Sequence, residues 1–226
     1  MNIKGLGEIE AIGFDIDGTI YAQWRLTVRA IFRYIAHSIF FLHYGLVRNE
    51  MHLLPPSDNF FQVQAEKMAK RMKCSPEEAS DRMDKIVYSG LEPYLKKVRC
   101  YPHVEETFRK FKEAGFKLAL LSDFPPEQKG SVWGVKKYCD VILGTEKLGA
   151  LKPNSYSFLK MAAALDVSPE KILYVGNSKK YDVRGAHRAG MKVAYLLPFW
   201  RKILNKPLKE ADISFSTYRQ LQEIVL

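Results

Sequence analysis

The stretch Ile-Glu-Ala-Ile-Gly-Phe-Asp-Ile-Asp-Gly-Thr-Ile occupies residues 9–20 of the 226-residue chain. Its apolar run, residues 11–14, is short and close to the amino terminus, which predicts a buried strand. Two carboxylates, Asp15 and Asp17, follow two residues apart, so their side chains would point to the same side if extended backbone continues that far. Gly18 then allows the chain to turn away sharply. The stretch therefore predicts a strand tip that presents two acids.

Paired carboxylates at a strand tip suit phosphate chemistry in three ways. They can hold a hard cation such as Mg2+. One can attack phosphorus as a nucleophile, and the other can give a proton to the leaving group and later take one from water. The pattern Asp-x-Asp alone is also typical of a turn with two solvated acids, so the rest of the chain has to decide between these interpretations.

The composition favours one large domain, or one domain with an insertion. Hydrophobic residues make up 47% of the chain, enough for a packed core, and 35 basic residues against 25 acidic ones give a net charge of +10. A basic surface suits anionic partners such as a phosphorylated small-molecule substrate. The charge is spread along the chain rather than gathered with aromatic residues, so we expect no nucleic acid as principal partner.

Cysteine usage and hydropathy point to the cytoplasm. The three cysteines are widely spaced and form no Cys-x-x-Cys pair, which predicts free thiols rather than disulfides or a zinc site. The amino terminus has no apolar signal core. The most apolar long segment, residues 28–47, contains arginines and histidines that a membrane span would exclude. We therefore expect a cytoplasmic protein with no membrane partner, and no pattern in the sequence predicts an oligomeric state.

Helical periodicity dominates the first half of the chain after residue 20. It predicts one helix over residues 26–46 that stops at Gly45, a second over 60–73, and a third from the cap residue Ser75 to about residue 89. A Gly-Leu-Glu-Pro sequence at 90–93 is expected to break this third helix. Polar residues form a stripe at i,i+4 steps on the first helix: Arg25, Arg29, Arg33 and His37.

Strands and helices alternate from residue 101 onward. The predicted strands cover residues 117–121, 141–143, 171–175, 192–196 and 213–215, and the predicted helices cover 103–114, 130–137, 154–165, 182–190 and 218–224. Residues 199–209 are expected to be basic and irregular. This alternation predicts an α/β fold, a Rossmann-like parallel sheet with helices on both faces. The helical stretch would be a separate inserted unit, with 1–20 and 101–226 as the core domain and 21–100 as the insertion.

Polar residues recur at the predicted strand tips after the first one. Ser122 follows the second strand, Lys152 precedes a predicted helix, and Asn177 and Asp182 follow a later strand. Ligands of open parallel sheets bind outside the carboxyl ends of the strands. We therefore expect these side chains to converge with Asp15 on one site.

Four short motifs occur in order along the chain: Asp15-Ile-Asp-Gly-Thr19, Leu-Leu-Ser122-Asp123, Leu151-Lys152-Pro153 and Gly176-Asn177-Ser-Lys-Lys-Tyr-Asp182. Together they resemble the signatures of the haloacid dehalogenase-like (HAD) hydrolase superfamily, and the resemblance covers essentially the whole chain. The helical stretch stands where phosphatases of this family insert a helical C1 cap. Such a cap would close over the site, exclude water and select the substrate.

The resemblance implies a role for each motif residue. Asp15 would be the nucleophile that forms an aspartyl-phosphate, and Asp17 the general acid and base. Ser122 would hydrogen-bond the phosphoryl group, and Lys152 would neutralise its charge. The implied phosphate-binding residues are Gly18, Thr19, Ser122, Asp123 and Lys152, and the implied Mg2+ ligands are Asp15, Asp17 through its backbone carbonyl, Asn177 and Asp182.

Two positions discriminate among reactions on this fold. Dehalogenases of the family lack the second acid of the first motif, so Asp17 favours hydrolysis of a phosphate monoester. At Asn177 the family usually has an acid, and an amide oxygen can still bind Mg2+ but brings no charge. We expect a Mg2+-dependent phosphatase that binds its metal weakly. A phosphomutase and a non-catalytic binding module on the same fold remain alternatives.

Several other residues have two interpretations. The stripe of Arg25, Arg29, Arg33 and His37 could bind an anionic leaving group, but a solvated helix face is favoured. Trp24 is expected to pack in the core, although stacking on a base or sugar is possible. Asp123 could cap its loop or contact the site. Tyr181, His103 and His187 are expected to be packing or surface residues, and a basic patch at 200–202 is expected to be a solvated loop.

Overall fold

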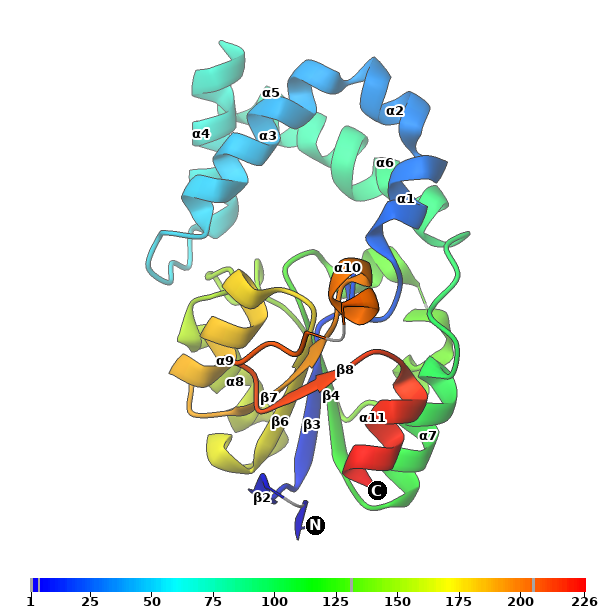
Figure 1. Cartoon of the computed structure of the whole chain (residues 1–226). Coiled ribbons are helices and arrows are strands. Elements are labelled where there is room, and N and C mark those ends of the chain that lie inside the picture. The colour runs from blue at the N-terminus through cyan, green and yellow to red at the C-terminus, as the bar shows by residue number, and fades with distance from the viewer. Residues whose placement is uncertain (1, 4, 131, 205) are drawn as a thin grey trace.

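A computed structural model describes residues 2–3, 5–130, 132–204 and 206–226 of the chain. Within these residues, a parallel sheet of six strands forms the centre of the core domain (Figure 1). Its order across the sheet is β5 (Val141–Gly144), β4 (Lys117–Ser122), β3 (Ala11–Phe14), β6 (Ile172–Gly176), β7 (Lys192–Leu196) and β8 (Ile213–Phe215). The predicted Rossmann-like fold is confirmed. The strand order reverses direction between β3 and β6, which is where open α/β sheets bind ligands.

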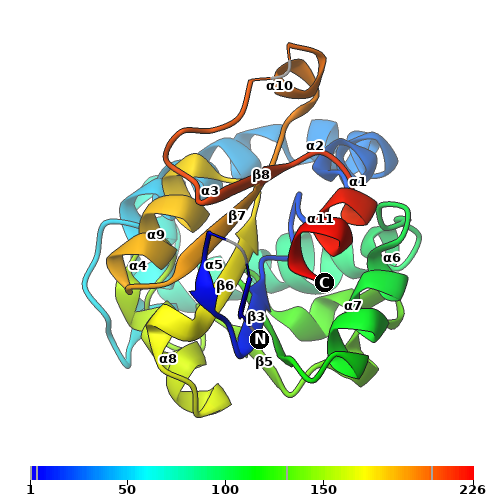
Figure 2. The same ribbon diagram turned by 60° about the horizontal axis from the view of Figure 1, so that its bottom comes forward.

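Side-chain alternation divides the core into two halves. On β3, Ile12 and Phe14 belong to one hydrophobic cluster, while their neighbour Ala11 belongs to the other. The first cluster packs under α7 (Val104–Glu113) and α11 (Tyr218–Val225), and the second under α8 (Ser155–Leu165) and α9 (Arg184–Arg188). Figure 2 shows these two pairs of helices on opposite sides of the sheet. Both faces of the sheet are buried, as a parallel sheet requires.

The inserted helices form a second layer beyond the carboxyl ends of the strands (Figure 1). They are α1 (Gln23–Arg29), α2 (Ile31–Ala36), α3 (Ser38–Met51), α4 (Phe60–Met72), α5 (Pro76–Met83), a π-helical turn (Asp84–Tyr88) and α6 (Ser89–Leu95). The chain enters and leaves this layer side by side, because Tyr21 forms an isolated bridge with Cys100. The predicted helical cap is therefore present, and its limits at residues 21 and 100 stay a prediction.

The single helix predicted over residues 26–46 is wrong. The segment bends at Ala30 and at His37, whose backbone angles leave the helical region, so three helices replace one. Gly45 does not end the last of them, and α3 continues to Met51. A glycine inside a helix costs only about 1 kcal/mol. Burial of Val47 and Met51 against α4 and its neighbours offsets that cost.

The predicted break at residues 90–93 is also wrong. After the π-helical turn, α6 runs through Gly90 and Pro93. Arg33 donates to the carbonyl of Ile86 at 3.0 Å and to that of Lys85, so a side chain from α2 satisfies carbonyls at this irregular turn. A Cβ on Gly90 would collide with the Arg33 guanidinium. The glycine is therefore needed for the close approach of α2, not for stopping the helix.

Smaller differences concern short elements of the core. Residues 199–209 are not wholly irregular, because α10 (Phe199–Ile203) forms there. The helix predicted over 130–137 is two short 3-10 turns, Val132–Gly134 and Lys136–Tyr138, and Ser131 lies outside the described residues. The helix predicted over 182–190 begins with a π-helical turn, Lys179–Val183, before α9. A small antiparallel pair, β1 (Asn2–Ile3) with β2 (Gly7–Glu8), was not predicted. No helix in the described part of the chain has the length and hydropathy to cross a membrane.

Candidate active site

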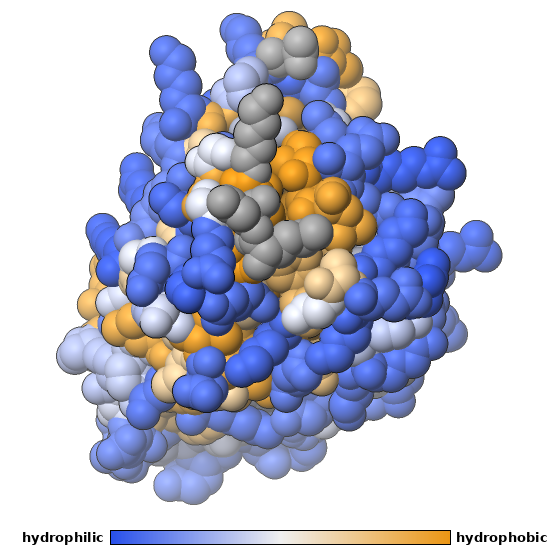
Figure 3. Space-filling model, turned by 90° about the horizontal axis from the view of Figure 1, so that it is seen from below, coloured by the Kyte–Doolittle hydropathy of each residue, from blue (hydrophilic) through white to orange (hydrophobic). Residues whose placement is uncertain are grey.

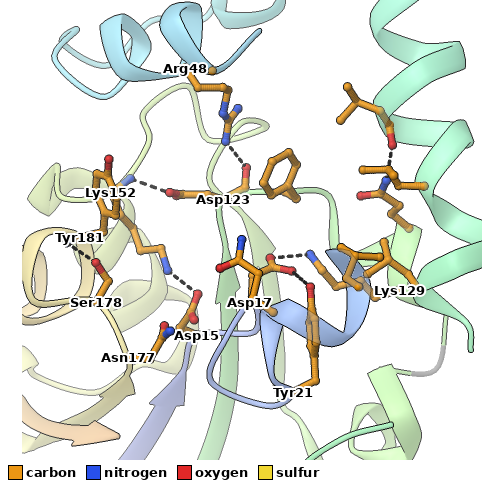
Figure 4. Close-up of a pocket in the computed structure, with 18 of the residues that line it drawn as sticks. Asp15, Asp17, Tyr21, Arg48, Asp123, Lys129, Lys152, Asn177, Ser178 and Tyr181 are labelled. Atoms are coloured by element: carbon orange, nitrogen blue, oxygen red, sulfur yellow. Dashed lines mark hydrogen bonds and ion pairs between the residues drawn. The ribbon is translucent and has the colours of Figure 1, made fainter. Parts of the chain in front are cut away.

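Asp15 lies at the end of β3 and forms an ion pair with Lys152 (Figure 4). The Lys152 ammonium lies 2.6 Å from Asp15 Oδ1 and 2.8 Å from Asp182 Oδ1, so one cation bridges two carboxylates. The Lys152 side chain is 3% exposed, and both acids are buried as well. Asp15 is 137 positions and Asp182 is 30 positions away from Lys152 in the sequence. The three side chains nevertheless meet at the tips of two strands, as the motifs predict.

Burial sets the protonation of this trio. Burial raises the pKa of Asp15 to about 7, against the opposing pull of the Lys152 ammonium. Burial also works against the charged form of Lys152, but the two carboxylates overcome it and raise the lysine pKa above its ordinary value. Two buried acids share one ammonium, so full ionisation of both would leave an excess of negative charge, which a further cation would offset.

Asp17 points to a different set of partners from Asp15. Its carboxylate accepts a hydrogen bond from the Tyr21 hydroxyl at 2.6 Å and one from the Ser122 hydroxyl at 3.1 Å. The Lys129 ammonium lies 3.0 Å from Asp17 Oδ2. Burial alone would raise the pKa of Asp17, but Lys129 and the two hydroxyls hold it below its ordinary value. Asp17 is therefore kept ionised by its own lysine.

Thr19 and Gly18 position the nucleophile and the fourth motif. The Thr19 hydroxyl donates to Asp15 Oδ2 at 2.7 Å and reaches Asn177 Oδ1 at 3.2 Å. Gly18 has a positive φ of 91°, and a Cβ there would collide with the Asn177 amide. Thr19 is fully buried, so its contacts are with these side chains. Direct phosphate binding by Gly18 and Thr19 stays a prediction.

Asp182 is fixed by the loop that follows β6. Its Oδ2 atom accepts hydrogen bonds from the backbone amides of Asn177 at 3.1 Å and Ser178 at 2.9 Å, while Oδ1 faces Lys152. A Cβ on Gly176 would collide with the Asp182 side chain. The glycine and the two amides explain why an acid five residues beyond Asn177 returns to the strand tip.

Ser122 and Asp123 end β4 next to these groups. The Ser122 hydroxyl accepts from Lys129 at 2.9 Å while it donates to Asp17, so it links those two charged residues. Asp123 Oδ1 accepts from the Thr145 hydroxyl at 2.7 Å and from the Lys152 amide at 3.1 Å. Asp123 therefore fixes the loop that carries Lys152, and it also lines the site. A contact of Ser122 with phosphate stays a prediction.

A cavity of about 710 Å3 lies between these residues and the cap. Asp15, Asp17, Lys129 and Lys152 line its floor (Figure 4). The cap side of the cavity is largely apolar or aromatic: Leu26, Tyr34, Phe41, Tyr44, Val87, Leu91 and Leu95. The arrangement could enclose a small organic molecule with its charged end on the floor and its carbon skeleton against the cap.

The end of α3 fastens the cap to the core. Arg48 forms an ion pair with Glu146, and it donates to the carbonyl of Asp123 at 3.0 Å. The side chains of Arg48 and Glu146 are 8% and 1% exposed. Burial raises the pKa of Glu146, and the Arg48 guanidinium opposes that rise. A buried ion pair thus crosses from the cap to the loop after β5.

His52, which directly follows α3, makes a second contact between cap and core. Its Nδ1 atom faces the carbonyl of Lys152, and its ring stacks on Tyr181 with centroids 4.3 Å apart. Burial lowers the pKa of His52, which favours the neutral imidazole. Tyr181 is a packing residue here, as expected, although it also lines the cavity.

The donor chemistry at the strand tips fits Mg2+. Asp15 and Asp182 supply carboxylates, Asn177 supplies an amide oxygen and Asp17 a backbone carbonyl, all oxygen ligands of the kind that Mg2+ prefers. In the described part of the chain, no three His, Cys, Asp or Glu side chains form a metal-binding group. The proposed ligand set contains only two side-chain carboxylates, those of Asp15 and Asp182, because its other two donors are a neutral amide and a backbone carbonyl. It therefore does not reach three such side chains. The four ligands themselves stay a prediction.

The sequence did not reveal several functional contacts. Lys129 is buried beside Asp17, but nothing in its local sequence distinguishes it from a surface lysine. Arg48 pairs with Glu146, which is 98 residues away, and no local pattern predicts that contact. The stripe of Arg25, Arg29, Arg33 and His37 does not line the cavity. Arg25 instead donates to the carbonyls of Arg99 and Cys100, at 2.9 and 3.3 Å.

Three expectations about isolated residues have clear outcomes. Trp24 is not a core residue, because 63% of it is exposed. His103 pairs with Glu106, and His187 pairs with Asp212, both at 2.9 Å on the partly exposed surface. These two histidines are surface residues, as expected.

Comparisons with curated proteins find phosphatases. The chain is 29% identical over 193 residues to a glyceraldehyde 3-phosphate phosphatase of Methanopyrus kandleri, and the match covers 81% of this chain and 82% of that protein. It is 28% identical to pyrophosphatase PpaX of Halalkalibacterium halodurans over 83% of each chain. A phosphoglycolate phosphatase of Haemophilus influenzae is 31% identical, but the match covers only 56% of this chain and 58% of that protein.

Solved structures with the same fold include a HAD phosphatase from Thermococcus onnurineus, with a TM-score of 0.64, 22% identity, and coverage of 96% and 97% of the two chains. A 2-haloacid dehalogenase from Pseudomonas syringae is equally similar in fold, with a TM-score of 0.65, 20% identity and the same coverage. The family model for haloacid dehalogenase-like hydrolases matches residues 12–196, which include all four motifs. The chain therefore belongs to the haloacid dehalogenase-like hydrolase family.

Proposed function

We propose that this protein is a Mg2+-dependent phosphatase that hydrolyses a small phosphate monoester through an aspartyl-phosphate on Asp15. The observation that carries the proposal is that two different lysines hold Asp15 and Asp17 on the cavity floor. Asp15 is held by Lys152 and Asp182 is held with it, while Asp17 is held separately by Lys129. A dehalogenase would have no use for a second acid beside the nucleophile, because a halide leaves without a proton.

In the first half-reaction, an Asp15 oxygen forms a bond to phosphorus while the bond from phosphorus to the ester oxygen breaks. The leaving oxygen takes its proton from Asp17, which must first accept that proton from a substrate bound as the phosphate monoanion, because Lys129 keeps Asp17 ionised in the empty site. The Lys152 ammonium, 2.6 Å from Asp15, offsets charge on the nucleophile and on the phosphoryl oxygens. A bound Mg2+ would supply further charge neutralisation between the carboxylate and the phosphate dianion.

In the second half-reaction, water attacks the aspartyl-phosphate, and Asp17 accepts the proton that water loses. Phosphate leaves, and Asp15 is restored. Lys129 favours the ionised form of Asp17, which is the form that acts as this base. The buried contacts of Arg48 and His52 with the core hold the cap in place, which limits the access of bulk water.

The substrate class follows from the cavity. A volume of about 710 Å3 fits a small molecule, and the apolar cap side chains that line the cavity would receive its leaving group. The named relatives act on glyceraldehyde 3-phosphate, phosphoglycolate and pyrophosphate. We propose a cytoplasmic location, which the free cysteines support.

Release of inorganic phosphate from a panel of esters tests this proposal. The panel should include the named substrates of the relatives together with alkyl and aryl phosphates. Phosphate release should require Mg2+ and should be lost in Asp15→Asn. A matched control is Asp166→Asn, an exposed residue with positive φ at the end of α8, where asparagine fits equally well. Turnover by Asp15→Asn, or a mutase reaction that releases no phosphate, would contradict the proposal.

A further inference from the structure

Exposed apolar side chains recur along the first three helices of the cap, α1, α2 and α3. Six of them follow one another at alternating steps of four and three residues: Val28, Phe32, Ile35, Ile39, Leu42 and Leu46. Phe32 is 83% exposed and Ile39 is 72% exposed. Within one helix, steps of three and four place residues on one face, and the bends at Ala30 and His37 divide these six residues among three helices. We call these six residues the outer stripe.

The outer stripe is not part of the cap core or of the cavity. On α3, Phe40, Val47 and Met51 pack inside the cap, and Phe41 and Arg48 line the cavity. With 3.6 residues per turn, Ile39, Leu42 and Leu46 lie on the opposite side of the helix from Phe41 and Arg48. The α3 part of the stripe therefore faces away from the active site, and exposed apolar residues gathered on one helix face are typical of an interaction site.

Charge distinguishes among possible partners of the outer stripe. The chain has no acidic residue between Asp17 and Glu50, whereas Arg25, Arg29 and Arg33 lie in that interval. Arg25 and Arg33 keep their charge while they donate to backbone carbonyls, with no acid among those partners. The spacing of the stripe is also that of a coiled-coil seam, which would suit a second copy of the chain. Two such copies would bring arginines together without any acid to pair with them, so self-association is disfavoured. An anionic lipid surface complements both the apolar row and the basic flanks.

A second element has the same chemistry. On and just after α10, Phe199, Trp200, Ile203 and Leu204 are each more than half exposed. The neighbouring residues Arg201 and Lys202 are basic, and the chain has no acid between Asp182 and Glu210. In Figure 1, α10 lies below α1, between the cap and the sheet. Figure 3 shows the molecule from below, with the cap on the far side, and hydrophobic surface is present at its top edge.

We propose that the outer stripe, together with α10, docks this protein on the surface of an anionic lipid bilayer. The helices would lie in the interface rather than cross it, since no described helix is long and apolar enough to span a membrane. Trp200 and Trp24 are exposed and suit the headgroup region, where tryptophan is enriched. This departs from the expectation of no membrane partner, because the structure leaves the apolar face of residues 28–47 uncovered.

Co-sedimentation of the full chain with lipid vesicles tests the proposal. We expect binding to vesicles that contain phosphatidylglycerol, weaker binding to pure phosphatidylcholine, and loss of binding as salt rises. The double variant Phe32→Gln/Ile39→Gln should bind at least about tenfold more weakly, because two inserted apolar side chains are removed. Trp200→Gln should weaken binding independently. The control is Leu159→Gln, an apolar residue on α8 that is 45% exposed outside both elements.

The outcomes separate this proposal from the catalytic one. Phe32 and Ile39 do not line the cavity, so the double variant should retain full phosphate release from a soluble substrate. No binding to anionic vesicles, or equal binding by the double variant and the wild type, would overturn the lipid proposal. A concentration-dependent dimer that Phe32→Gln/Ile39→Gln abolishes would also overturn it, by assigning the stripe to a second copy of the chain.

Discussion

Replacement of Arg48 by methionine should destabilise the protein strongly. Methionine retains much of the aliphatic length but removes the charge that faces Glu146, whose side chain is 1% exposed. Loss of one member of a buried ion pair costs about 3–5 kcal/mol, because the other charge is left buried without its partner. For a protein of this size, 1 kcal/mol shifts the melting temperature by about 2–4 °C, so Tm should fall by roughly 6–20 °C.

The pH dependence of Arg48→Met follows from Glu146. Burial already raises the pKa of Glu146, and the guanidinium holds that rise back, so its removal raises the folded-state pKa further. The folded variant then keeps a proton that the unfolded chain releases above its ordinary pKa of about 4.3. Folded Glu146 therefore binds the extra proton between that value and its raised pKa. The loss of stability should be smallest below this window and should grow as the pH rises through it.

Urea unfolding of Arg48→Met at about pH 4 and about pH 8 measures this effect. The double variant Arg48→Met/Glu146→Gln is the control, because it removes both charges and should recover most of the lost stability. Tyr88 can still donate to the remaining side-chain oxygen, as it does at 3.0 Å in the wild type. A single variant as stable as the wild type, or a double variant no more stable than the single one, would refute the account of this contact.

Three further predictions concern the cavity floor. Lys129→Met removes the ammonium 3.0 Å from Asp17 and raises its pKa, so the limb of the kcat/KM profile that Asp17 governs should move to higher pH by about 1–3 units. An unmoved profile would separate Lys129 from Asp17, and Lys129→Arg is the control. Asp15→Asn should keep or raise the melting temperature at about pH 8, because burial disfavours the charge it removes; a marked drop would contradict this. Chelation by EDTA should abolish phosphate release until Mg2+ is restored, and Asn177→Asp should lower the Mg2+ concentration for half-maximal rate by about tenfold; activity in EDTA would exclude the metal.

Local signals were sufficient to predict the α/β core. The strands of residues 11–14, 117–121 and 171–175 are short apolar runs, and each is followed directly by a polar motif. A parallel strand buried on both faces needs continuous hydrophobic residues, so its sequence alone identifies it. The same motifs correctly brought Asp15, Lys152 and Asp182 together, because the carboxyl ends of parallel strands meet at one edge.

The cap was harder to predict because its details depend on distant contacts. The bends at Ala30 and His37 interrupt an apolar periodicity that is continuous in the sequence. Helix α6 passes through Gly90 because Arg33 on another helix contacts the turn before it. The expectation that Trp24 packs in the core was wrong, because composition alone does not reveal which face of an apolar helix lacks a partner.

The site residues that the sequence missed have the same explanation. Lys129 follows Ser122 by seven residues in a loop, and only the folded chain brings its ammonium to Asp17. Nothing in its local sequence distinguishes Arg48 from other basic residues of the cap, yet it is the buried link to Glu146. Each of these contacts joins segments with no local sequence relationship, so no motif records it.

A single turnover in water labelled with heavy oxygen tests the proposed role of Asp15 most directly. With enzyme in excess over a good phosphate ester, the first half-reaction puts an Asp15 oxygen on phosphorus, and water then cleaves the aspartyl-phosphate. Because Asp17 is the proposed base for water that attacks phosphorus, the released phosphate should carry one labelled oxygen and Asp15 should stay unlabelled, whereas label in Asp15 would place the attack on its carboxyl carbon and contradict that role. In either case, quenched enzyme should contain a phosphoryl group on the peptide with Asp15. Full turnover with no phosphoryl group trapped on that peptide, and with activity retained in Asp15→Asn, would contradict the account.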